Sequence, residues 1–122
     1  MNRPLCVLIV EGSEDDAELL VYELERGGYV PIYERVDTPD AMNAALDKQQ
    51  WDIVVADYTL PSFSGPAALN LLKQRGLDLP FLIVSGTIGE EIAVAAMKAG
   101  AHDYLMKGKL ARLAPAVERE LR

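Results

Sequence analysis

"DIVVADYTLPSFSG", residues 52–65, places four consecutive apolar residues, Ile53 to Ala56, directly before an acid, Asp57. A strand with one face in water usually alternates apolar and polar residues, whereas an unbroken apolar run is typical of a strand covered on both faces. The run "FLIV" at 81–84 has the same character. Together these runs predict the centre of a parallel sheet with helices packed on both of its faces.

Outward from this stretch, five apolar segments alternate with five amphipathic ones. The predicted strands are Leu5–Val10, Val30–Val36, Asp52–Ala56, Phe81–Ser85 and His102–Met106. The predicted helices are Glu14–Arg26, Thr38–Lys48, Ser64–Arg75, a helix opened by a Thr87/Glu90 capping box and ended by Gly100, and Lys109–Leu121. Since crossovers between parallel strands are right-handed, the order βαβαβαβαβα predicts one open, doubly wound α/β sheet.

Two prolines refine this prediction. Pro31 interrupts the second strand and places it at an edge of the sheet, because proline cannot donate to the hydrogen-bond ladder. Pro115 requires the last helix to kink or restart.

Length and composition limit the class of protein. The 122 residues suffice for a single domain, so we expect one domain over residues 1–122. A net charge of -7 argues against direct nucleic-acid binding, and the longest apolar runs are too short to cross a membrane. The lone Cys6 and the absence of a long apolar leader before the first strand predict a soluble protein in a reducing cytoplasm.

Polar side chains follow several of the predicted strands. Glu11 and Gly12 follow the first strand, Asp57 the third, Ser85 the fourth and Lys107 the fifth. Ligands of open α/β sheets bind at this carboxyl edge. Asp57 is a candidate nucleophile toward phosphorus, Lys107 a candidate ligand of phosphate oxygens, and Ser85 a candidate hydrogen-bond donor to them. The acids beginning at Glu11 are candidate ligands of a hard cation.

The motifs around these residues match a known family. Asp57 is followed by Pro61 four residues on and by Gly65 eight residues on, with "LIVSG" (82–86) and "AHDYLMK" (101–107) downstream. Over essentially its whole length the chain resembles the receiver domain of two-component response regulators. The resemblance implies a flavodoxin-like (βα)5 fold with strand order 2-1-3-4-5. It also implies that Asp57 accepts a phosphoryl group from a sensor histidine kinase or a phosphotransfer protein.

The resemblance also assigns roles to the other strand-end residues. Ser85 would be the switch hydroxyl, Lys107 would contact the phosphoryl oxygen, and Tyr104 would be the switch aromatic that rotates inward. The output face would be the fourth helix, fifth strand and fifth helix, residues 88–121, which would signal to a downstream effector domain or protein. We do not expect an enzyme that acts on other molecules; any catalysis would concern phosphoryl transfer to Asp57 and its later hydrolysis.

The metal site implied by the family departs from the usual pattern. The resemblance implies Mg2+ held by Glu11, Asp57 and the backbone carbonyl of Thr59. The family's second acid after the first strand, which touches the metal, is replaced here by Gly12. Because Mg2+ prefers carboxylates and water in octahedral geometry, we expect its binding to be weakened. Gly108 is a second departure, since many members have a proline after the lysine.

Acids in the first turn of the first helix offer one way to compensate. Glu14, Asp15 or Asp16 could reach back to the metal, but acids in a first turn also complement the helix dipole, which is the favoured interpretation. Ser13 with Asp16 is also a candidate capping box.

Three other functions compete with that of a phosphoacceptor. A phosphorylation-independent pseudo-receiver, acting as a protein interaction module through residues 88–121, is the alternative that Gly12 and Gly108 favour. A flavin-binding protein is disfavoured because "EGSEDD" (11–16) is acidic where a phosphate loop would lie. A phosphatase of the aspartyl-nucleophile type would carry its nucleophile on the first strand, whereas Asp57 follows the third.

Overall fold

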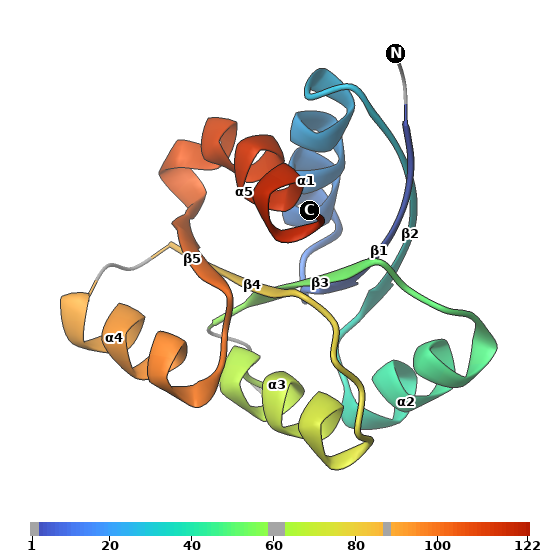
Figure 1. Ribbon diagram of the computed structural model, residues 1–122, viewed down its shortest axis with the longest axis vertical. Helices are drawn as coiled ribbons and strands as arrows, with labels where there is room; N and C mark the ends of the chain where they lie inside the picture. The colour runs from blue at the N-terminus through green and yellow to red at the C-terminus, as the bar shows by residue number, and fades with distance from the viewer. Residues whose placement is uncertain (1–2, 59–62, 87–88) are drawn as a thin grey trace.

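The computed structural model describes residues 3–58, 63–86 and 89–122. Their strands form one parallel five-stranded sheet in the order β2-β1-β3-β4-β5, as predicted. Figure 1 shows the sheet between two layers of helices. The strands are β1 Arg3–Val10, β2 Tyr29–Val36, β3 Ile53–Asp57, β4 Phe81–Ser85 and β5 Asp103–Met106. The helices are α1 Glu14–Arg26, α2 Pro39–Lys48, α3 Gly65–Gln74, α4 Glu90–Ala99, the 3-10 helix η1 Lys107–Arg112, and α5 Leu113–Glu120.

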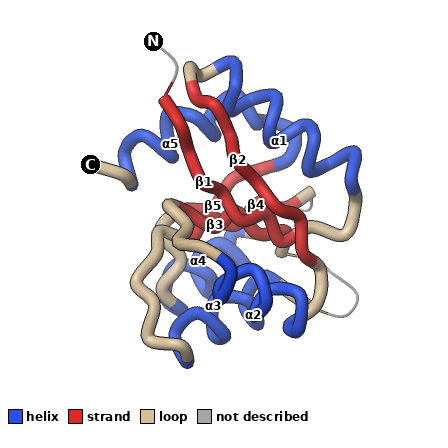
Figure 2. The backbone as a smooth tube through the Cα atoms, turned by 90° about the vertical axis from the view of Figure 1, so that its right-hand side faces the viewer, coloured by secondary structure: helices blue, strands red, loops and turns tan. Residues whose placement is uncertain are grey.

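Helices α1 and α5 cover one face of the sheet, and α2, α3 and α4 cover the other (Figure 1). Figure 2, turned by 90°, shows the same sandwich with the sheet between the two helical layers. Alternate residues of β1 enter the two cores: Val7 and Ile9 pack under α1 and α5, whereas Leu8 and Val10 pack under α2 and α3. Every residue of β3 and of β4 is buried, as their unbroken apolar runs predict.

The edges of the elements differ from the predictions by short, explicable amounts. Thr38 and Ser64, predicted as first helical residues, are N-caps whose hydroxyls accept backbone N–H bonds from residues three positions on. The last predicted helix is divided: η1 ends at Arg112 and α5 restarts at Leu113, so that Pro115 falls in the first turn, where its missing N–H costs least. Thr87 lies outside the described residues, but the predicted Thr87/Glu90 capping box is wrong, because α4 begins at Glu90 with Gly89 as its N-cap.

The edge position predicted for β2 is confirmed, since β2 pairs only with β1 in the described sheet. Its exposed apolar side chains include Val30, Ile32 and Tyr33. Cys6, on the neighbouring strand, is only half-buried and packs against the α2 and α3 core. Among the described residues, no helix is long and apolar enough to cross a membrane.

Helices α1 and α5 approach each other closely at Gly27, the residue that caps α1. A β-carbon at Gly27 would overlap the β-carbon of Ala114, although the backbone there, at φ -82°, suits any residue. We therefore expect Gly27→Ala to lower the free energy of unfolding by about 2 kcal/mol through overpacking. Urea denaturation measures the loss, which should shrink markedly in an Ala114→Gly background; an equal loss in both backgrounds would contradict the steric explanation.

Candidate functional site

Four predicted residues meet at the carboxyl edge of the sheet. Glu11 directly follows β1, Asp57 and Ser85 are the last residues of β3 and β4, and Lys107 directly follows β5. Parallel strands end on the same side, which is why residues so far apart in sequence converge. Ser85 is fully buried, and Glu11 and Asp57 are only 3% and 8% exposed. The site therefore combines two nearly buried carboxylates and a buried hydroxyl with an ammonium whose side chain is partly exposed.

Lys107 joins the carboxylates of this site. Its Nζ lies 3.3 Å from Asp57 Oδ2 and 3.1 Å from Glu11 Oε2. A third carboxylate is closer still, since Nζ donates to Asp16 Oδ2 at 2.7 Å. One ammonium thus neutralises part of the charge of three acids drawn from two strand ends and the first turn of α1.

Asp16 lies in the first turn of α1, as predicted, but it also contacts the strand-end site. Ser13 caps α1 as predicted, because its Oγ accepts the Asp16 backbone N–H at 3.2 Å. The second half of the capping box does not form: the Ser13 N–H donates to Glu11 Oε1 at 3.2 Å, and the Asp16 carboxylate binds Lys107. Asp16 therefore belongs to the strand-end site as well as to the helix terminus.

Burial and charge shift the proton affinities within the site. Burial and the negative charge of Asp57 raise the pKa of Glu11 above its ordinary value, against the lowering effect of Lys107. Burial disfavours the Lys107 ammonium, but hydrogen bonds to Asp16 and Glu11 and the charges of Glu11 and Asp57 outweigh it and raise its pKa. Lys107 is thus a permanent cation at physiological pH.

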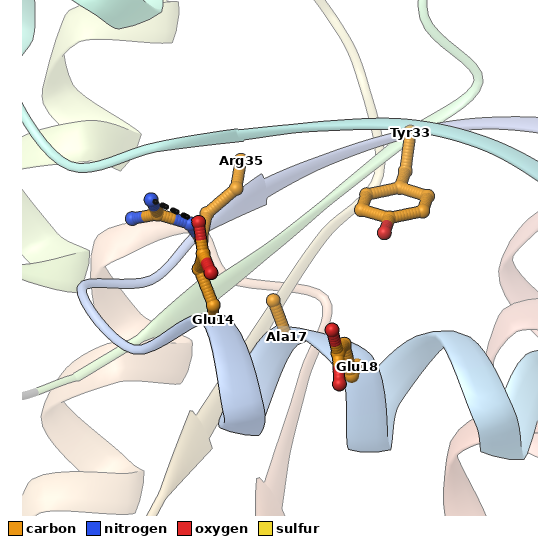
Figure 3. A pocket seen from close by; sticks show the side chains of 5 residues that line it. All are labelled: Glu14, Ala17, Glu18, Tyr33 and Arg35. Carbon is orange, nitrogen blue, oxygen red and sulfur yellow. Dashed lines mark ion pairs between the residues drawn. The ribbon is translucent and has the colours of Figure 1, made fainter.

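A second cation borders the β1–α1 connection from the β2 side. Arg35 donates to the Glu11 carbonyl at 3.2 Å and pairs with Glu14 at 3.6 Å. Glu14 lines a hollow of about 330 Å³ between α1 and β2. Figure 3 shows the Glu14–Arg35 pair at one end of this hollow and Tyr33 opposite Glu18. Of the three acids in the first turn of α1, only Asp16 contacts a described residue of the strand-end site.

Gly65 brings α3 close to the phosphoacceptor candidate. A β-carbon there would lie 3.1 Å from the Asp57 carbonyl oxygen and 3.2 Å from the Tyr58 Cα. This tight approach explains the glycine eight residues after Asp57. Gly86 and Gly108 are less constrained: a β-carbon at Gly86 would make ordinary contact with the Lys107 side chain, and one at Gly108 would meet nothing within 4 Å.

The remaining predicted residues have different outcomes. Tyr104, on β5, is half-buried against the α2 and α3 core, and its role in switching stays a prediction. The carbonyl of Thr59 and the start of the output segment at residue 88 lie outside the described residues. His102, the single histidine, accepts the Phe81 N–H through Nδ1 at 3.0 Å and so caps β4.

The buried oxygens match Mg2+ in type. Glu11 and Asp57 are two nearly buried carboxylates at one edge, and Mg2+ is commonly held by one or two carboxylates with several waters. The described residues do not include three His, Cys, Asp or Glu side chains arranged to hold a metal by themselves. Among the described residues, Glu11 and Asp57 are thus the ones that would hold Mg2+ together with water; the predicted third ligand, the Thr59 carbonyl, lies outside them.

A parallel (βα)5 sheet with an acid, a hydroxyl and a lysine at the ends of β3, β4 and β5 defines a class of signalling domain. The chain belongs to the response regulator receiver domain family, whose sequence pattern matches residues 7–118.

Relatives of known function are similar over most of the chain. It is 31% identical to the phosphate regulon transcriptional regulatory protein PhoB of Klebsiella pneumoniae, covering 83% of this chain and 44% of that protein. It is 32% identical to the alkaline phosphatase synthesis transcriptional regulatory protein PhoP of Bacillus subtilis, covering 88% and 43%. The chain thus spans less than half the length of these relatives.

A solved structure of a receiver domain is similar in both sequence and fold. The signal receiver domain of a signal transduction histidine kinase from Syntrophus aciditrophicus is 29% identical, with a TM-score of 0.77 over 96% of this chain and 89% of that one.

Proposed function

We propose that residues 1–122 form one receiver domain that accepts a phosphoryl group on Asp57 in a two-component signalling pathway. The observation that carries this proposal is the placement of Asp57, 8% exposed at the end of β3, with the Lys107 ammonium 3.3 Å from its Oδ2. A buried carboxylate beside a fixed cation is suited to attack phosphorus and to hold the product. Membership of the receiver family supports the same assignment.

The proposed transfer has simple chemistry. A carboxylate oxygen of Asp57 forms a bond to phosphorus while the bond from phosphorus to the donor's nitrogen, or to the oxygen of acetyl phosphate, breaks. The electron pair leaves with the donor. Lys107 offers an N–H to an oxygen of the transferred group, and the buried Ser85 hydroxyl lies at the end of the neighbouring strand. When bound, Mg2+ would supply further positive charge against the phosphoryl oxygens.

Partners follow from the family. The phosphoryl donor would be a sensor histidine kinase or a phosphotransfer protein. The downstream partner would be an effector domain or protein that contacts α4, β5 and α5. In this proposal Tyr104 and Ser85 move together when Asp57 is phosphorylated. Cytoplasmic location remains a prediction from the sequence.

The alternative is a phosphorylation-independent interaction module. Its specific support is Gly12, which stands where the family resemblance implies a metal-binding acid, and Gly108, which stands where many members have a proline. Intact-mass spectrometry after incubation with acetyl phosphate, with Mg2+ and with a chelator, separates the two. A gain of one phosphoryl group that depends on Mg2+ supports the phosphoacceptor. No gain at any Mg2+ concentration supports the interaction module.

Gly12→Asp should tighten Mg2+ binding by about tenfold or more, because it returns a carboxylate to the end of β1. Among the described glycines, a positive φ occurs at Gly28, Gly76 and Gly100. Gly12 is not one of them, so its backbone conformation is open to an aspartate. Isothermal titration with MgCl2 measures the affinity, and Gly12→Asn serves as a control of equal size without charge. Equal affinities for the wild type and Gly12→Asp would show that the Gly12 position does not face the metal.

A further inference from the structure

The ammonium of Lys107 has three N–H donors and is surrounded by three carboxylates. It donates to Asp16 at 2.7 Å and to Asp57 at 3.3 Å, and lies 3.1 Å from Glu11. Lysine has no acceptor, so each of these contacts uses a donor. When a phosphoryl group occupies Asp57, the donor now directed to Oδ2 is the one free to turn to it. The other two hold the ammonium in place.

We propose that Asp16 is a positioning residue, which fixes the Lys107 ammonium so that its remaining donor is aimed at the group carried by Asp57. This inference rests on the proposed phosphoacceptor function. It assigns to the first turn of α1 a part of the site that the strand ends alone do not supply.

Three features of Asp16 support this role. Its contact with Lys107 is the shortest of the three. Its backbone is held by the Ser13 cap, so the carboxylate projects from a fixed helix terminus rather than from a loop. Asp16 and Lys107 also border one small hollow of about 30 Å³ together with Leu20 and Leu110, where α1 meets η1. The ion pair therefore connects α1 with the segment that carries the lysine.

The neighbouring acid provides a matched control. Asp15 is exposed in the same helical turn and makes no ion pair with any residue in the described ranges. Asp15→Asn and Asp16→Asn remove the same charge and change the same number of atoms. Any difference between them therefore reports the contact with Lys107, not the net charge of the site.

The experiment compares wild type, Asp15→Asn, Asp16→Asn and Asp16→Glu in two measurements. The first is the initial rate of phosphoryl gain from acetyl phosphate with saturating Mg2+, followed by intact mass. We expect Asp16→Asn to be slower by about tenfold, Asp15→Asn to be close to wild type, and Asp16→Glu to recover part of the rate.

The second measurement is NMR of the lysine ammonium groups, with the Lys107 signal identified by its loss in Lys107→Met. A hydrogen-bonded ammonium exchanges its protons slowly enough to be observed. We expect this signal in wild type and Asp15→Asn and its loss in Asp16→Asn. Urea denaturation confirms that each variant is folded.

Equal labelling rates for the two Asn variants, or an unchanged Lys107 signal in Asp16→Asn, would overturn the positioning role. A wild-type chain that takes up no phosphoryl group would instead remove the proposed function and the positioning role in transfer with it. In that case the ammonium spectra alone would still decide whether Asp16 fixes Lys107, so the two failures are distinguishable.

Discussion

Asp57→Asn is expected to take up no phosphoryl group from acetyl phosphate during a period in which the wild type is fully labelled. An amide oxygen is a far weaker nucleophile than a carboxylate oxygen, and the change leaves the size of the side chain unaltered. Asp57 is buried at the end of β3 and its Oδ2 is 3.3 Å from the Lys107 ammonium. Intact-mass spectrometry measures the outcome directly.

Two other carboxylates make this a demanding test. Glu11 and Asp16 also lie against Lys107, at 3.1 and 2.7 Å, and could receive the group in place of Asp57. Persistent labelling of Asp57→Asn would contradict the assignment, and peptide mass mapping would then locate the acceptor. Asp78→Asn is the control, because Asp78 is exposed in the connection from α3 to β4, at the opposite edge of the sheet.

The strand-end site was predictable because its geometry follows from the sheet. The unbroken apolar runs before Asp57 and Ser85 indicate buried parallel strands, and parallel strands must end at the same edge. The identity of the residues there then suggests phosphoryl chemistry. No detailed side-chain geometry is needed for this step, which is why four residues spread over most of the chain could be grouped from sequence alone.

The partner of Lys107 in α1 was not predictable in the same way. Glu14, Asp15 and Asp16 are consecutive acids in one helical turn, and each satisfies the general preference for negative charge there. The helix directs them differently: Glu14 toward Arg35, Asp15 into solvent and Asp16 toward Lys107. This choice depends on the rotation of α1 relative to β2 and η1, which is set by packing between distant segments.

The break in the last helix was predictable only in part. Pro115 signals that a helix must restart, but its position does not reveal that the residues before it form a 3-10 helix. That 3-10 segment begins at Lys107 itself and contains a non-helical residue, Lys109, at φ -133° and ψ 47°. The lysine therefore projects from the junction of β5 and η1, and its reach to α1 follows from this junction.

Lys107→Met should lower the free energy of unfolding by about 3 kcal/mol at neutral pH, although methionine preserves most of the aliphatic length. Glu11 and Asp57 are nearly buried, and removing their cation leaves charges without compensation. The value is at the low end for a broken buried pair because Lys107 and Asp16 retain side-chain exposures of 26% and 38%. Urea denaturation at neutral and mildly acidic pH measures the loss.

The loss of unfolding free energy in Lys107→Met should be smaller at mildly acidic pH because of the protonation of Glu11. Its pKa is raised in the native protein by burial and by Asp57, so its contribution to stability is greatest below the ordinary glutamate pKa and is lost as pH rises through the raised pKa. Lys107 opposes this shift. Without Lys107 the pKa of Glu11 rises further, so the contribution of Glu11 to stability is lost only at higher pH. Lys107 has a raised pKa of its own, and its stabilisation is complete below the ordinary lysine pKa, so its titration does not contribute in this range.

Lys109→Met separates this effect from a general change of charge. Lys109 is an exposed lysine in the same 3-10 helix, two residues beyond Lys107. Its replacement removes the same charge and should change the free energy of unfolding by less than about 0.5 kcal/mol. If both variants lost the same stability, or if the Lys107→Met deficit did not vary with pH, the ammonium would not be compensating Glu11. A smaller deficit of Lys107→Met at mildly acidic pH thus tests whether the lysine that we propose for phosphoryl transfer also stabilises the acidic site before transfer.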